Sequence, residues 1–80
     1  MSLQLRDEIE ALFGELCSLQ EKRLLAFARR LLPRITSDDL MQPNDYPELE
    51  NHPVFRYEEG VLEGLRSARM ALLASLCYSP

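Results

Sequence analysis

Proline is concentrated in one segment of this 80-residue chain, and this constrains the fold more than any other feature. Four of the five prolines fall between residues 33 and 53, and the fifth is the last residue. Proline has no amide hydrogen and clashes with the preceding turn, so it is excluded from helix interiors. Apolar residues recur at spacings of three and four on both sides of this segment, and no stretch alternates as a strand would. The sequence therefore predicts an all-α domain, with a proline-rich connection over residues 33–52.

The stretch before the prolines predicts two helices, over residues 3–16 and 18–32. Ser18 and Glu21 have the spacing of a capping box, in which each side chain binds the other's backbone amide at a helix start. Pro33 ends the second helix. Because so few residues separate the two helices, we expect an antiparallel hairpin with its apolar stripes facing each other. The stripe of the first helix consists of Leu5, Ile9, Leu12, Phe13 and Leu16.

A longer helix is predicted over residues 53–76. Pro53 suits the first helical position, where its missing amide hydrogen costs nothing, and Asn51 or His52 can cap the helix. Two adjacent apolar stripes run along it, so we expect it to contact more than one neighbour. Together they consist of Val54, Phe55, Val61, Leu62, Leu65, Ala68, Leu72, Leu73 and Leu76.

Gly60, Gly64 and Ala68 place three small residues on one face of this helix. Each glycine costs a helix about 0.8–1 kcal/mol relative to alanine, and the usual reason for such a cost is close approach of another backbone. That backbone could belong to the same chain or to a second copy. A chain this short buries a modest core, which favours a homodimer. The expected interface consists of Gly60, Gly64, Leu65, Ala68 and Leu72.

Charge and cysteine content restrict the possible functions. The formal net charge is −4, which disfavours binding to nucleic acid, whose affinity for proteins comes mostly from lysine and arginine. The two cysteines have no metal-binding or redox spacing, and the sequence contains no signal peptide or membrane span, so we expect a cytoplasmic protein with reduced thiols. One basic cluster keeps a nucleic-acid-binding regulator as an alternative; it consists of Lys22, Arg23, Arg29, Arg30 and Arg34.

Glu58, Glu59, Glu63 and His52 could in principle hold a metal or act as an acid and a base, which keeps an enzyme or metal protein as a second alternative. The Glu-x-x-His pairs of di-metal helical bundles are missing, however. Acidic residues near a helix start are also stabilised by the helix dipole, which explains them without chemistry. We therefore expect no catalytic site and no cofactor.

The aromatic residues around the end of the connection are candidates for a partner surface, because tyrosine and arginine are enriched at interface hot spots. The candidate set is Tyr46, Phe55, Arg56 and Tyr57. The leucine spacing of the predicted hairpin resembles the partner-binding helices of small bacterial antitoxins. The leading interpretation is a small non-enzymatic interaction protein: an adaptor, a regulator or an antitoxin-like partner.

Overall fold

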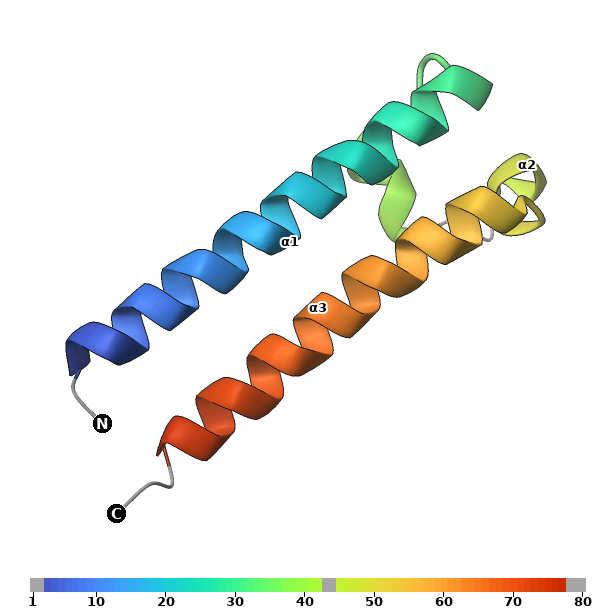
Figure 1. The fold of residues 1–80 in the computed structure, drawn as a ribbon. Helices are drawn as coiled ribbons and strands as arrows, with labels where there is room; N and C mark the ends of the chain where they lie inside the picture. The colour runs from blue at the N-terminus through green and yellow to red at the C-terminus, as the bar shows by residue number, and fades with distance from the viewer. Residues whose placement is uncertain (1–2, 43–44, 78–80) are drawn as a thin grey trace.

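Two long antiparallel helices make up most of the molecule (Figure 1). The computed structural model describes residues 3–42 and 45–77, so Pro43 of the predicted connection lies outside the described residues. The elements are α1 (Leu3–Leu31), a 3-10 turn η1 (Asp39–Met41), the short α2 (Pro47–Glu50) and α3 (Pro53–Cys77). None of the described residues lies in a strand, which confirms the all-α class. The molecule measures 47 × 18 × 16 Å.

The predicted hairpin within residues 3–32 is wrong, because α1 is one continuous helix through Ser18. Proline is absent between Leu3 and Leu31, and Gly14 alone does not end a helix whose neighbours have good helical propensity. The Glu21 carboxylate does not cap a helix start but pairs with Arg66 of α3 at 2.9 Å. The antiparallel partner of α1 is therefore α3, and the start of α1 and the end of α3 lie at the same end of the molecule (Figure 1).

Replacement of Ser18 by alanine distinguishes one helix from two. Ser18 is exposed in the middle of α1, where alanine has the higher helical propensity, so we expect Ser18→Ala to stabilise the fold by roughly 0.5 kcal/mol. Loss of a capping serine would instead cost about 1 kcal/mol. Urea denaturation followed by circular dichroism measures the difference, and a destabilised variant would contradict the continuous helix.

The core lies at the closed end of the α1–α3 hairpin, where the connection packs against both helices. None of residues 4–16 and 63–76 is buried. The hydrophobic core consists of Cys17, Leu24, Ala28, Ile35, Leu49, Phe55 and Leu62. The open end, where α1 begins and α3 ends, thus has apolar side chains but no enclosed core among its described residues.

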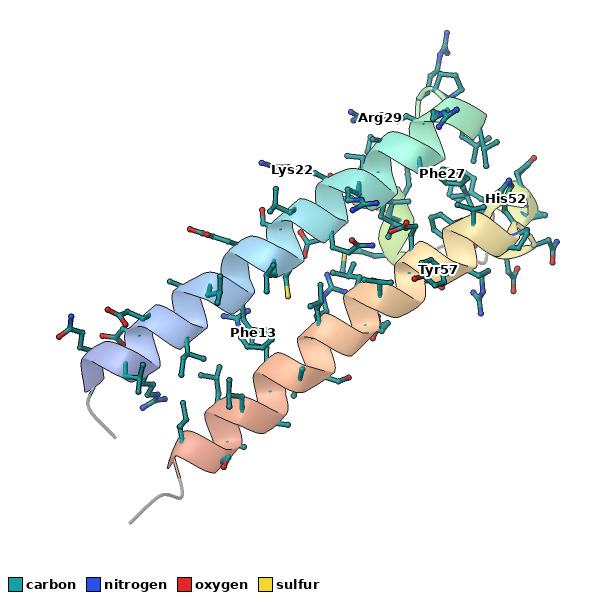
Figure 2. All side chains as sticks on the ribbon, in the orientation of Figure 1. Phe13, Lys22, Phe27, Arg29, His52 and Tyr57 are labelled. Atoms are coloured by element: carbon teal, nitrogen blue, oxygen red, sulfur yellow. The ribbon has the colours of Figure 1, made fainter. Side chains whose placement is uncertain are left out.

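The start of α3 is fixed as the sequence predicts. The helix begins at Pro53, and the Nδ1 atom of His52 accepts a hydrogen bond from the Val54 amide at 3.2 Å. The His52 ring also meets Phe27 of α1 edge to face, with ring centroids 5.0 Å apart, and Figure 2 shows the two rings side by side. His52 therefore both caps α3 and ties it to α1.

Within the connection, Asp39 and Thr36 hold the turn that leads into η1. The Thr36 amide and hydroxyl donate to the Asp39 carboxylate at 2.9 and 3.0 Å. The hydrogen bond from the Thr36 backbone is the main cause that lowers the pKa of Asp39 below its ordinary value. Burial raises the pKa of the neighbouring Tyr46.

Candidate protein-interaction surface

The small residues of α3 face solvent rather than a neighbouring helix. Gly60, Gly64 and Ala68 are exposed, and a methyl group added at either glycine would meet no other atom within 4 Å. A close helix crossing within the chain is therefore ruled out as the reason for these glycines. Leu65 packs against the core and Leu72 follows it by two turns on the same side, so the five residues of the predicted interface do not share one face. A homodimer contact through the glycines stays a prediction.

Substitution of Gly64 by alanine tests whether another backbone covers this face. With open space around the added methyl group, Gly64→Ala should raise the free energy of unfolding by about 0.8–1 kcal/mol through helical propensity alone. Thermal denaturation at two protein concentrations measures the change, with Gly60→Ala as the companion variant. A destabilisation that grows with concentration would show instead that a second chain packs tightly on the glycines.

The carboxylates and His52 do not come together as a site. Glu59 pairs with Arg56 at 3.1 Å and Glu63 lies 3.8 Å from Arg66. His52 is occupied as the cap of α3. In the described part of the chain there is no group of three or more histidine, cysteine or acidic side chains that could hold a metal ion. The geometry therefore gives no support to the metal-binding alternative.

Glu58 instead cross-links the two long helices through Gln20, the one buried polar side chain among the described residues. The Gln20 Nε2 atom donates to the Glu58 side-chain Oε2 at 2.6 Å and to its backbone carbonyl at 3.0 Å. Arg23 adds a more distant charge at 3.8 Å. Hydrogen bonds to a charged acceptor are stronger than neutral ones, so this contact fixes how α1 lies against α3.

The five residues of the basic cluster are exposed, but their side chains do not form one continuous surface patch. Arg23 faces Glu58, and the Arg29 Nε atom donates to the Ile35 carbonyl at 3.1 Å. Lys22 projects from the side of α1 away from α3 (Figure 2). Two of the five cations are thus engaged within the chain, which weakens the basis for a nucleic-acid interface.

The aromatic set is likewise divided between core and surface. Phe55 is fully buried, so its assignment to a partner surface is wrong. Tyr46 is partly buried and packs against the core, while Arg56 pairs with Glu59. Tyr57, at 69% exposed, remains available to a partner.

A run of exposed apolar residues lies on α1, at positions where the sequence predicts an intramolecular contact. Leu12, Leu16 and Leu19 are 55%, 38% and 59% exposed, and Ile9 is partly buried. We call these four residues the leucine seam; Leu5, at 43% exposed, continues its spacing. The contact with the core starts on a different side of the helix, at Cys17, Gln20 and Leu24. The seam was missed because the predicted break near residue 17 divided it.

The spacing of the seam is that of a coiled coil. From Leu5 to Leu19 the apolar residues follow one another at four, three, four and three residues. Such a heptad pattern keeps one stripe facing a partner helix along its length. Beside the stripe, exposed charged residues recur every seven positions: Glu8, Glu15 and Lys22. We call these three residues the charged flank. This continuity across Ser18 is the sequence signal that identifies the seam.

The opposite side of the hairpin is covered by the connection. A groove of about 620 Å³ lies there between α1, the η1 region and α3, and its lining includes Glu21, Leu40 and Glu63. Glu21 lies almost opposite Leu19 on α1, since successive helical residues rotate by about 100°. None of the four residues of the leucine seam lines this groove, whereas Lys22 of the charged flank does.

Comparisons with protein-family models, curated proteins and solved structures give no significant match to this chain. Within the described residues, neither long helix has an apolar stretch sufficient to cross a bilayer.

Proposed function

We propose that this chain is a small helical interaction protein, an adaptor or regulator, that works by packing the leucine seam of α1 against another helix. The observation that carries the proposal is the exposure of Leu12, Leu16 and Leu19 on one heptad stripe. Single exposed leucines are ordinary on protein surfaces, but a contiguous apolar stripe rimmed by charges is typical of an interaction site. An amphipathic stripe of this kind fits helix-to-helix recognition.

The energetics favour occupation of the seam. Full burial of a leucine or isoleucine side chain contributes about 1.5–3 kcal/mol, so four partly exposed residues offer several kcal/mol to a partner. The residues of the metal-binding and nucleic-acid-binding alternatives provide less support for a binding site. Of the candidate metal ligands, Glu59 pairs with Arg56 and His52 caps α3. Two cations of the basic cluster, Arg23 and Arg29, interact with Glu58 and the Ile35 carbonyl within the chain.

Site-specific photo-crosslinking tests whether the seam is the working surface. A benzophenone amino acid placed at Leu12 should give discrete covalent protein adducts in the cells that naturally make the chain. The same probe at Ser67, an exposed position of α3, serves as the control. Adduct mass then separates a second copy, at twice the mass of the chain, from a different protein.

Two outcomes would overturn this proposal. One is the absence of adducts from Leu12 under conditions where the variant is folded by circular dichroism. The other is an equal yield from Leu12 and Ser67, which would show that contact with the seam is not selective. Salt-dependent retention of nucleic acid, abolished by reversal of Arg30 and Arg34, would instead favour the nucleic-acid alternative.

A further inference from the structure

We infer that the helix that covers the leucine seam is α1 of a second copy of this chain, packed antiparallel about a two-fold axis. The inference rests on the proposed use of the seam as an interaction surface. It adds the identity of the partner, the direction of the partner helix and the register of the pair.

The apolar residues of the seam match a second, inverted seam. When two copies of α1 run antiparallel with the centres of their seams aligned, Ile9 of each copy packs beside Leu19 of the other. Leu12 of each copy packs beside Leu16 in the same way. Every residue of the seam then has an apolar neighbour, and the two-fold axis repeats each contact.

The charged flank points to the antiparallel direction. In an antiparallel pair of helices, a given flank of one helix lies against the equivalent flank of the other. In a parallel pair, it lies against the opposite flank of the other helix. The antiparallel arrangement brings Glu8 of each copy beside Lys22 of the other, which gives two opposite-charge contacts. In a parallel pair, by contrast, the charged flank would face the side of α1 that carries Phe13 and Gln20.

Glu15 lies near the two-fold axis in this register, beside Glu15 of the second copy. Displacement of the helices by one heptad would relieve this repulsion, because Glu15 would then meet Lys22. The same displacement moves Leu12 onto Arg23 and Ile9 onto Ala26. Apolar burial of leucine contributes more than an exposed ion pair, so the aligned seams prevail over the displaced ones.

The hairpin itself indicates why a second copy is needed. None of residues 4–16 and 63–76 in its open half is buried, although α1 and α3 both carry apolar side chains there. Chains of this size commonly gain the missing core from oligomerisation. Since the connection occupies the other side, the seam side is where a second hairpin completes the core.

Sedimentation velocity of the purified full chain at micromolar concentrations tests the second copy directly. The unmodified chain should sediment as a dimer. Leu12→Gln combined with Leu16→Gln should weaken dimerisation roughly 100-fold or more, because each change is repeated in both copies. Met70→Gln, which removes a more exposed apolar residue from α3, should leave the dimer unchanged.

Charge variants test direction and register independently of apolar packing. Lys22→Glu should weaken the dimer roughly tenfold, since it turns two attractions with Glu8 into repulsions. The double variant Glu8→Lys, Lys22→Glu should restore affinity to within about threefold at unchanged net charge. Glu15→Gln should tighten the dimer about two- to fivefold. Arg34→Glu, which matches the charge change of Lys22→Glu, should have little effect.

Each alternative result would overturn the inference. A monomer at micromolar concentrations excludes the second copy, while adducts of another mass from Leu12 would still support the proposed function. A dimer in which the charge exchange gives no recovery and Glu15→Gln gives no gain is not built on antiparallel α1 helices.

Discussion

Replacement of Phe55 by alanine is expected to remove most of the free energy of unfolding of this chain. Phe55 is fully enclosed at the start of α3, within the core that joins α3 to α1 and the connection. Truncation of a buried phenylalanine typically costs about 3–5 kcal/mol, which combines lost apolar burial and an unfilled cavity. Small domains have a total stability near the lower end of about 5–15 kcal/mol, so this loss is a large fraction of it.

The measurement is urea denaturation at a fixed protein concentration, followed by far-UV circular dichroism. Val54→Ala is the matched control, because Val54 precedes Phe55 in the same turn but is 46% exposed. We expect it to change the free energy of unfolding by less than about 1 kcal/mol. Phe55→Leu, which keeps most of the buried volume, should lie between the two. Equal effects of Phe55→Ala and Val54→Ala would mean that the core is not centred on Phe55.

The helical class and the ends of the long helices next to the connection follow from the sequence because local chemistry determines them. Pro33 stops α1 and Pro53 starts α3 through the geometry of the proline ring, whatever surrounds them. The same local reasoning failed at Ser18. A capping box is a preference worth about 1 kcal/mol, and the continuous α1 gains more by extending its contact with α3.

That error also displaced the candidate site. Once α1 is unbroken, its partner is α3, and the residues that meet it are Cys17, Gln20 and Leu24 rather than the earlier leucines. Because α1 turns the side with Cys17, Gln20 and Leu24 toward α3, the leucine seam is left exposed. Which side faces α3 depends on contacts between residues far apart in the chain. Composition and local motifs carry no information on such contacts. The heptad spacing was present in the sequence, but its meaning depended on knowing that the helix continues.

The two glycines of α3 also show that a local sequence feature does not reveal which residues are in contact. Their cost to helical propensity suggested a close neighbour, yet Gly60 and Gly64 have open space around them. Low helical propensity marks a position in a helix as unusual, but it does not indicate whether another element packs against that position. Among the described residues of the chain, no neighbouring element packs closely on either glycine.

The contact between Gln20 and Glu58 should show strong energetic coupling. Gln20→Leu removes two hydrogen bonds and leaves the Glu58 carboxylate against an apolar side chain. Hydrogen bonds to charged groups contribute about 1.5–3 kcal/mol, and we expect a loss of that size. Glu58→Leu should cost a similar amount, because it leaves the amide of Gln20 buried with one fewer acceptor.

Combination of the two changes should recover most of the loss. In the double variant both polar partners are gone and two leucines can pack together between the helices, so the effects of the single changes should not add. A double-mutant cycle by urea denaturation gives the coupling, which we expect to exceed about 1 kcal/mol. Additive single effects would show that the two side chains do not interact in solution. A double variant that recovers stability but loses its defined association state would show that the polar contact specifies how α1 lies against α3, and therefore where the leucine seam points.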